Sequence, residues 1–457
     1  MKTTLSLLAA ALLLAACAGP EPRRLTAREA ADAALPAGFT TPQGTGPVAA
    51  ELPWAQAFQG ERLQRLMPLA LERNRDLRVA VANIESARAT ASARDADLWP
   101  TVNAVFSGSR TPTAAGGINS LYQAGVQVSA YELDLFGRLR GLSSAAAAQV
   151  LAAESAQQAV RTALVASVAT AEIALQADEA LLRLTRDTLA TREQSLALVK
   201  QRFDGGVAGE LDLRSAESAL QAARAALAQT QRQRALDENA LALLLGGPLP
   251  ADLPAPRGDV SAFEPLAELP AGLPAEVLTR RPDIRQAEFA LAAADANIDA
   301  ARAAFWPRIT LTASAGTASG HLSDLFKNSA WSFAPALVQP LFDAGRNRAN
   351  LAAVRAAREV ALAQYEKAIQ TAFREVADGL SSRSALAEQR SALAAQVEAE
   401  RRRLDAAEQR YAAGVSSALD RLDAQRSLFA AQQSLVQVQS LRAQSLVALY
   451  RALGGAR

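Results

Sequence analysis

Apolar residues follow a helical period from about Leu139 to Leu245, with one break at residues 203–207. Neither proline nor glycine interrupts residues 142–204, and large apolar residues return there every seven positions, at Val168, Leu175, Leu182, Leu189, Leu196 and Phe203. A seven-residue apolar repeat with charged and small residues between its members predicts helices that pack through a narrow seam, as in a coiled coil. Because the break contains a glycine pair, the pattern predicts an antiparallel helical hairpin, and its first arm would measure about 90–100 Å.

The same pattern returns near the C-terminus. Three pairs of matching motifs lie 207 or 208 positions apart: Gly206-Val207 with Gly414-Val415, Gly137-Arg138 with Gly345-Arg346, and Trp99-Pro100 with Trp306-Pro307. A constant offset over most of the chain indicates a tandem duplication of one long unit. The two copies would cover residues 61–247 and 274–457, each with one helix, two strands and a long helical hairpin. A proline-rich connector at 248–273 would cross from one copy to the other.

Apolar and polar residues alternate in four short stretches, two in each copy. These are residues 102–107 and 122–130, then 309–316 and 331–338. Pro335 and Pro340 predict that the last of them has a bulge or is demoted to an edge strand. Strands of about 9–11 residues are long enough to cross a bilayer at a tilt. The alternation is equally compatible with half-exposed hairpins of a soluble protein. If the strands do enter a bilayer, several chains must combine them, because four strands cannot close a barrel and open edges leave backbone groups unsatisfied.

A helix is also expected before each pair of strands. The first would cover Glu61–Leu98 and end at Trp99-Pro100, because the residue before a proline is disfavoured in the α region. The second would begin at about Pro274 and run through Phe305. Helices over Glu61–Leu98 and Glu210–Leu245, each about 55 Å long, together match the long first arm. Two shorter helices are therefore expected to stack end to end along it.

The N-terminus has the pattern of a secretory signal. Residues 1–16 contain Lys2 and an apolar run that is too short to be a transmembrane helix, and Cys17 follows in the sequence Leu-Ala-Ala-Cys. This sequence resembles a bacterial lipobox, which predicts that Cys17 becomes a lipidated, palmitate-bearing N-terminus. The alternative is an ordinary signal peptide with an incidental cysteine. Residues 17–60 are rich in proline and glycine and predict an extended arm.

Composition argues against several classes of function. The net charge of +2 gives no electrostatic footprint for nucleic acid. His321 is the only histidine and has no second ligand near it in the sequence, so no metal site is expected. No P-loop or dinucleotide fingerprint occurs. The chain is therefore expected to have no cofactor and not to be an enzyme.

Several motifs together carry a family resemblance that covers nearly the whole chain. They are the two hairpin tips, the lipobox, Asn74-Arg75-Asp76-Leu77, Arg280-Arg281-Pro282-Asp283, and Gln339-Pro340-Leu341-Phe342-Asp343 followed by Gly345-Arg346. In these motifs the chain resembles the TolC-like outer-membrane factors of tripartite efflux pumps, in particular the OprM/NodT lipoprotein branch.

The resemblance implies a mainly α fold with a membrane β-barrel part. Long antiparallel hairpins would form an α-barrel in the periplasm, and four transmembrane strands from each chain would form a twelve-stranded barrel in a homotrimer. The absence of aspartate at residue 18 implies the outer membrane for the lipid anchor. The implied partners are a periplasmic membrane-fusion adaptor, an inner-membrane efflux transporter and outer-membrane lipid.

The second hairpin tip carries the expected gate. Asp420 and Asp423 are three residues apart on one helical face, and three-fold symmetry would turn each into a ring of carboxylates. The resemblance implies Leu419 as an apolar plug and Arg426 as a salt-bridge partner. Ser215 stands in the first copy where Asp423 stands in the second, so the pore would have three-fold symmetry only. The alternative is that the two aspartates are surface charges at a helix N-terminus, which the helix dipole favours.

The glycine-valine turns at the tips are the expected adaptor contacts, namely Gly205, Gly206, Val207, Gly414 and Val415. Glycine permits the tight reversal of the chain and the close approach of another backbone. A purely structural role of the glycines as helix C-caps accounts for the turns equally well. The sequence thus predicts a passive outer-membrane exit duct for drugs or other small molecules. A type I protein-secretion duct and a periplasmic coiled-coil lipoprotein scaffold without a pore stay open as alternatives.

Overall fold

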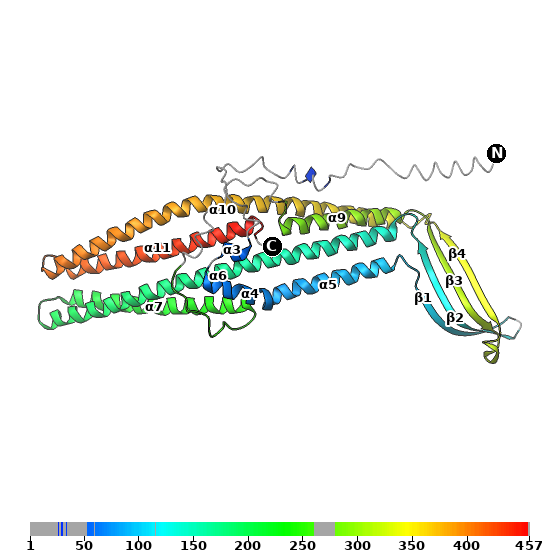
Figure 1. The fold of residues 1–457 in the computed structure, drawn as a ribbon, viewed down its shortest axis with the longest axis horizontal. Helices are drawn as coiled ribbons and strands as arrows, with labels where there is room; N and C mark the ends of the chain where they lie inside the picture. Colours follow the sequence, from blue (N-terminus) through cyan, green and yellow to red (C-terminus); the bar gives the residue numbers. More distant parts are fainter. Residues whose placement is uncertain are drawn as a thin grey trace.

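The computed structural model describes residues 53–58, 60–114, 116–259 and 279–455, and a few positions between 26 and 33. The molecule is elongated, with long helices along most of its length and one sheet at an end (Figure 1). The expected signal peptide, the lipidation site Cys17 and most of the N-terminal arm lie outside the described residues. Helix, two strands and two helices follow one another twice along the chain, in the order α5(Arg75–Ala96), β1(Val102–Pro112), β2(Ile118–Leu133), α6(Arg138–Asp204), α7(Glu210–Leu245), then α9(Pro282–Ala303), β3(Arg308–Ser319), β4(Ser329–Val338), α10(Arg346–Ala412), α11(Ala418–Ala452).

The four strands form one antiparallel sheet in the order β1-β2-β3-β4, which leaves β1 and β4 as its edges. In the register, Val102 lies beside Val128, Val128 beside Ala313, and Ala313 beside Phe333. The next row, one residue along, is polar: Asn103, Gln127, Ser314 and Ser332. One face of the sheet is therefore apolar and the other polar, because neighbouring side chains in a strand point to opposite faces.

The strand that contains Pro335 has no bulge, and it is an edge strand, which agrees with the expected demotion. Pro335 lies directly opposite Leu311, and the β3–β4 register continues on both sides of it. Proline is tolerated because β4 is an edge strand, where a missing N–H need not break the ladder. The irregularity lies in β2 instead, where the register shifts between Val128 and Tyr131 and Ala130 has a φ of 51°.

The helical part is built on the two long helices α6 and α10, each of 67 residues. Helix α6 packs against α7 over one part of its length and against α5 over the other, and α10 packs against α11 and α9 in the same way. Helices α6 and α9 also pack together and join the two halves of the chain. The prediction of long hairpins with shorter helices stacked along them is confirmed.

The helix expected over Glu61–Leu98 is wrong as a single element. It is divided into α4(Glu61–Arg73) and α5, because Asn74 has extended backbone angles (φ −58°, ψ 134°). The Asn74 side chain caps α5 by accepting the N–H of Leu77 at 3.0 Å. Its amide also donates to the carbonyl of Leu244 at 2.9 Å. Asparagine is a favoured N-cap, so a new helix begins where one continuous helix was expected.

The second short helix also begins later than expected. It starts at Pro282 rather than near Pro274, and residues 260–278 lie outside the described ranges. Proline at the first helical position is a common helix start, because its missing N–H would have had no partner there. Arg281 precedes it and donates to the carbonyl of Ala452 at 2.8 Å and to Glu375 at 2.8 Å. This arginine thereby attaches α9 to both α10 and α11.

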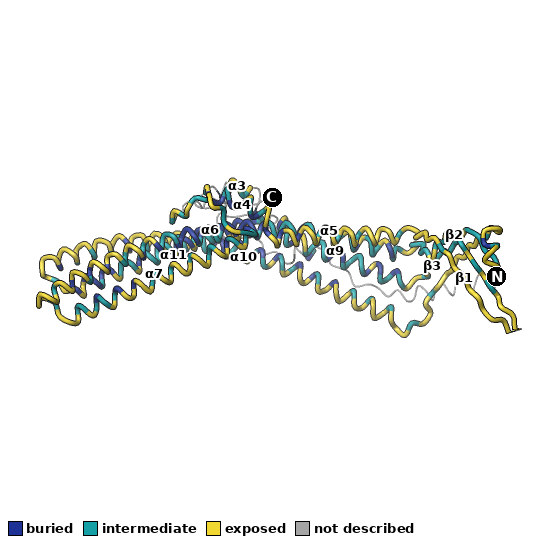
Figure 2. Tube along the Cα trace, turned by 90° about the horizontal axis from the view of Figure 1, so that it is seen from below, coloured by how far each residue is buried: buried dark blue, intermediate teal, exposed yellow. Residues whose placement is uncertain are grey.

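The densest part of the core lies near the middle of the molecule, where buried residues concentrate (Figure 2). Short segments pack there on the long helices, namely α3(Trp54–Ala57), α4 and residue Phe58. The ring of Phe58 meets that of Tyr450 edge to face, with 5.2 Å between centroids. Aromatic pairs in this geometry contribute beyond their buried area.

The seven-residue seam expected in α6 holds only in part. Val168, Leu175 and Leu182 are buried, Leu189 and Leu196 are half-buried, and Phe203 is 38% exposed. A straight helix with 3.6 residues per turn drifts by about 20° per seven residues, so a strict repeat leaves the interface. Beyond Leu182 the buried positions are instead Thr185, Arg192, Ser195 and Val199.

The described part of the connector, residues 248–259, lies against the middle of α6. The side-chain oxygen of Gln176 accepts the backbone N–H groups of Arg257, Gly258 and Asp259, at 2.9–3.3 Å. Nearby, Arg62 of α4 forms a buried ion pair with Glu172 at 2.7 Å and donates to the carbonyl of Pro254. These contacts attach the connector and α4 to the same stretch of α6.

Candidate outer-membrane channel and its tips

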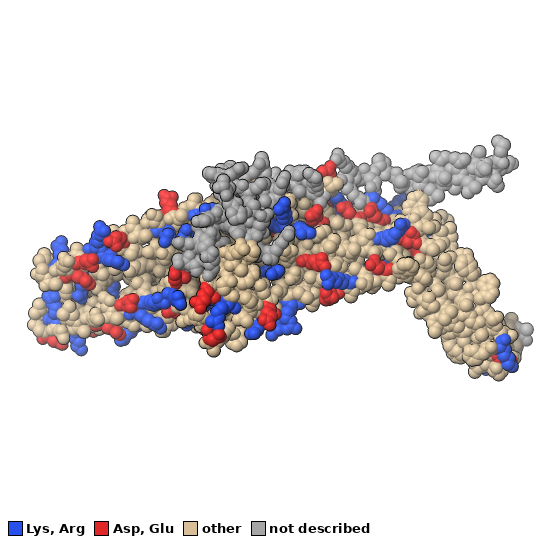
Figure 3. All heavy atoms as spheres, viewed as in Figure 1, with Lys and Arg blue, Asp and Glu red and all other residues tan. Residues whose placement is uncertain are grey.

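The sheet presents a wide apolar surface. Large apolar side chains are exposed along its strands: Val102, Phe106, Val126, Trp331, Phe333 and Leu337. In the space-filling view the strands show almost no charged atoms except at the two ends of the sheet, whereas charges cover the helical part (Figure 3). Exposed apolar surface of this extent marks contact with a membrane or another protein.

The first tip is a tight turn between α6 and α7. Gly206 has a φ of 73°, a conformation that glycine adopts without strain, and the N–H of Val207 bonds to the carbonyl of Arg202 at 2.8 Å. This closes the end of α6 in the manner of a glycine C-cap. Val207 points outward and is 70% exposed.

The second tip repeats this geometry. Gly414 has a φ of 72°, and the N–H of Val415 bonds to the carbonyl of Arg410 at 2.9 Å. Val415 is 68% exposed. Each hairpin therefore ends in one exposed valine beside a glycine that no side chain covers.

The tips differ where the second helix begins. Ser417 and Asp420 form a capping box: the N–H of Asp420 bonds to Ser417 Oγ, and Asp420 Oδ2 accepts the N–H of Ser417 at 3.1 Å. Asp420 therefore has the structural role that the alternative interpretation gave it. At the first tip, Gly209 precedes α7 and provides no side-chain cap.

Asp423 lies in a small ion-pair network. It accepts Arg403 of α10 at 2.5 Å and Arg426 at 2.7 Å, and Leu419 beside it is 61% exposed. The hydrogen bond from Arg403, followed by that from Arg426, holds the pKa of Asp423 below its usual range. The structure thus brings Asp423 and Arg426 together as expected and pairs Asp420 with Ser417.

The partners of Asp420 and Asp423 were not among the residues expected from the sequence. Ser417 could have been identified as the partner of Asp420, because Ser-x-x-Asp before an apolar run is a capping signal. Arg403 is 20 positions away on another helix, and no sequence spacing relates it to Asp423.

A buried cationic cluster lies between the two hairpins close to the second tip. The ring of Tyr411 has the guanidinium of Arg202 at 4.9 Å from its centroid and that of Arg421 at 4.5 Å. Arg192 of α6 donates to Gln425 of α11 at 2.6 Å. These contacts join the end of the first hairpin to the second.

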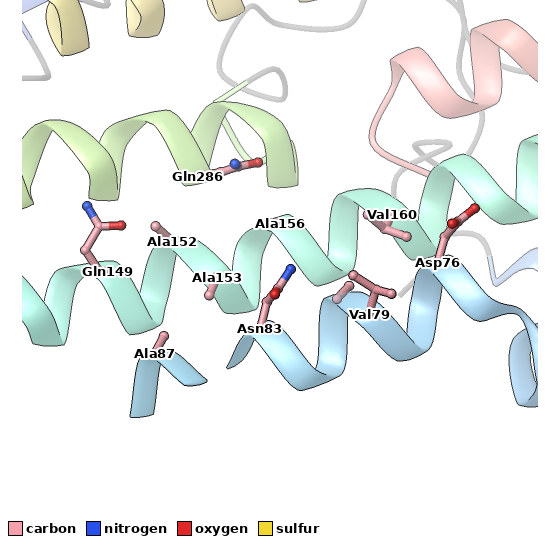
Figure 4. Close-up of a pocket in the computed structure, with 11 residues that line it drawn as sticks. Asp76, Val79, Asn83, Ala87, Gln149, Ala152, Ala153, Ala156, Val160 and Gln286 are labelled. Carbon is pink, nitrogen blue, oxygen red and sulfur yellow. The ribbon is translucent and has the colours of Figure 1, made fainter. Parts of the chain in front are cut away.

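A groove of about 490 Å³ lies along α5 and α6, with Gln286 of α9 at its margin (Figure 4). Alanine and valine side chains form most of its lining, and Asp76, Asn83 and Gln149 provide polar groups. Within the described ranges no group of three or more histidine, cysteine, aspartate or glutamate side chains is placed to hold a metal ion.

An amphipathic sheet continuous with long helical hairpins defines a membrane channel protein whose strands lie in the bilayer and whose helices extend beyond it. The chain belongs to the outer membrane efflux protein family, whose model matches residues 66–247 and 273–455. The family consists of efflux channels and is not an enzyme family.

The relatives agree with this assignment. The solvent efflux pump outer membrane protein SrpC of Pseudomonas putida is 48% identical, over 89% of this chain and 88% of that protein. Outer membrane protein OprJ of Pseudomonas aeruginosa is 43% identical, over 88% of this chain and 86% of that protein.

Solved structures of similar channels cover the fold. The Neisseria gonorrhoeae MtrE outer membrane channel, in its open state, superposes with a TM-score of 0.84 at 39% identity, over 95% of this chain and 97% of that one. A membrane protein from Pseudomonas aeruginosa gives 0.86 at 40% identity, over 95% and 99%. The chain is thus an outer-membrane exit duct that extends into the periplasm.

Proposed function

We propose that three copies of this chain form the exit duct of a tripartite efflux system. The observation that carries the proposal is the four-stranded sheet, which is apolar on one face and has two open edges. In a bilayer those edges must be paired, and three copies give twelve strands in one closed barrel. The helical hairpins would then stand side by side as a periplasmic α-barrel.

The partners follow from the position of the tips. A duct without an energy source needs a transporter in the inner membrane and an adaptor between the two, and the tips are the part furthest from the sheet (Figure 1). Gly205, Gly206, Val207, Gly414 and Val415 form two exposed turns of the same geometry. We assign them to adaptor docking, and we assign the cargo to drugs or other small molecules. No catalytic role is assigned to any residue.

For the gate, the geometry favours Asp423 over Asp420. Asp423 with Arg403 and Arg426 forms a charged network at the second tip, and three-fold symmetry would place three such networks around the pore, with Leu419 adjacent. Asp420 is engaged in capping its own helix, so its contribution to a ring of charge is restricted.

Single-channel conductance of the purified protein in planar bilayers tests both the pore and the gate. We expect a small conductance for the wild type and a several-fold larger one for Asp423→Ala, because the network that holds the tip is broken. Asp212→Ala, in the first tip, is the matched control and should behave as the wild type. Equal conductance of all three proteins would remove Asp423 from the gate, and no channels at all from inserted, folded protein would contradict the duct.

Lipidation at Cys17 is a separate proposal, supported by the lipobox sequence alone. Cells expressing the wild type should incorporate labelled palmitate into the protein, and Cys17→Ser should not. Continued labelling of the variant would show that the anchor lies elsewhere.

A further inference from the structure

The second tip contains buried hydrogen-bond donors that no group in the described residues satisfies. Across those residues, five buried side-chain polar atoms have no hydrogen-bond partner, and three of them belong to this tip: Ser416 Oγ, Arg421 Nε and Arg421 Nη2. All three can donate a hydrogen bond. Arg421 is only 8% exposed, so the two nitrogen atoms are held away from water. Each of these three donor atoms therefore lacks an acceptor.

The two free nitrogen atoms of Arg421 form one edge of its guanidinium. Nε–H and one N–H of Nη2 point in parallel, which is the fork that a carboxylate accepts with both oxygens. The face of the same guanidinium is already occupied by the ring of Tyr411, 4.5 Å away. The edge is therefore the part of Arg421 that lacks a partner, and its geometry specifies a planar oxyanion.

The surrounding charges have the same sign. Arg192 is 7% exposed, and burial, followed by the positive charges of Arg421 and Arg426, lowers its pKa. Its hydrogen-bond partner is the neutral Gln425. No ion pair joins Arg192 or Arg421 to a carboxylate in the described part of the chain. The nearest acidic residues in sequence are engaged, Asp420 by Ser417 and Asp423 by Arg403 and Arg426.

We propose that Arg421, supported by Arg192, forms a carboxylate-binding site between α6 and α11 at the second tip. Buried like charges without a counter-charge are unfavourable, and a bound carboxylate would both neutralise them and satisfy the free fork. Because the donor atoms are closed to solvent, the ligand enters when α6 and α11 separate locally. It then stabilises the conformation that admits it. This site does not depend on the gate or docking roles assigned above.

The test is the thermal unfolding of the purified full-length protein in sodium acetate and in sodium chloride at equal ionic strength. A carboxylate that binds the folded protein raises the apparent unfolding temperature in a saturable way, by about 1–3 °C at ten times its dissociation constant. Arg421→Leu should lose this rise, because it removes the fork. Arg402→Leu is the matched control, since Arg402 is an exposed arginine of the same hairpin, and it should keep the rise.

A second variant separates the fork from the charge. Arg421→Lys retains the positive charge but cannot offer two parallel donors, and it should bind acetate at least ten-fold more weakly than the wild type. The proposal is wrong if chloride raises the unfolding temperature as much as acetate does, because that result indicates charge screening. It is equally wrong if Arg421→Leu responds to acetate as the wild type does.

Discussion

Asn74 and Arg281 make the same contact in the two halves of the chain. Each precedes a short helix that leads to the strands. Each also donates a side-chain hydrogen bond to a carbonyl at the end of the helix that stacks end to end with that short helix: Asn74 to Leu244 of α7 at 2.9 Å, and Arg281 to Ala452 of α11 at 2.8 Å. The two joints are therefore built with different residues on one plan. They lie close to the dense core in the middle of the molecule, where the short helices next to the sheet (α5 and α9) meet the helices next to the tips (α7 and α11).

The first joint predicts a sharp difference between adjacent glycines. Gly246 has a φ of 70°, and a Cβ there would lie 2.4 Å from the carbonyl oxygen of Arg73. Gly246→Ala should therefore lower the free energy of unfolding by about 2 kcal/mol or more. A Cβ at Gly247 would meet nothing within 4 Å, so Gly247→Ala should be nearly neutral. Thermal unfolding followed by circular dichroism measures both, and equal losses would contradict the close approach at Gly246.

The buried ion pair between α4 and α6 predicts strong coupling between Arg62 and Glu172. Arg62→Met leaves Glu172 buried without its partner and should destabilise the protein by about 3–5 kcal/mol. Arg62→Met combined with Glu172→Leu should recover most of that loss, because no unpaired charge remains. Thermal unfolding of the two single variants and the double variant gives the coupling energy. If the destabilisations of the two single variants simply add in the double variant, the ion pair between the two side chains contributes little to stability.

Asp178 predicts a pH dependence of stability near neutrality. Its Oδ2 is buried at the α6–α7 interface and no donor group lies within reach while both carboxylates are ionised, and burial, followed by a hydrogen bond shared with Asp237 and the negative charge of Asp237, raises its pKa to about 7. The folded protein therefore binds a proton that the unfolded chain releases near pH 4, and its contribution to stability is complete below pH 4 and lost as pH rises through 7.

Asp178→Asn keeps the shape of the side chain without the charge. The variant should be more stable than the wild type at pH 8, by about 2–4 kcal/mol, and the difference should vanish towards pH 4. Unfolding temperatures at pH 4–8 provide the measurement. Asp187→Asn, on the exposed face of α6, is the control that removes an aspartate charge from the same helix. A constant difference for Asp178→Asn would show that burial does not perturb its ionisation.

The exposed valines predict where an adaptor is bound. Val415→Asp places a charge on the apolar part of the second tip and should reduce cross-linking to a periplasmic adaptor by at least half. Leu441→Asp, an exposed apolar position of α11 away from the tip, should leave cross-linking unchanged. If both variants cross-link as the wild type does, the docking surface lies elsewhere.

The sequence could predict those elements that depend on residues close together in the chain. The tip turns, the long helices and the four strands all follow from period, glycine position and alternation. The break at Asn74 was not predicted, because the apolar period continues through it. The chain leaves the helical conformation there because the Asn74 side chain caps α5 and bonds to Leu244. The partner of Asp423 could not be predicted, because Arg403 reaches it from a neighbouring helix. The same holds for the Arg202–Tyr411–Arg421 stack, which depends on how two hairpins 208 positions apart lie together.

The two edges of the sheet are unlike each other, since one is β1 and the other is β4. Pairing of like edges would invert one copy relative to its neighbour across the bilayer, so a ring whose helices all extend to the same side pairs β1 of each copy with β4 of the next. Every copy then contributes two different interfaces, and a single copy with a blocked edge leaves the whole ring open. Expressed together with the wild type, such a variant would be dominant over it.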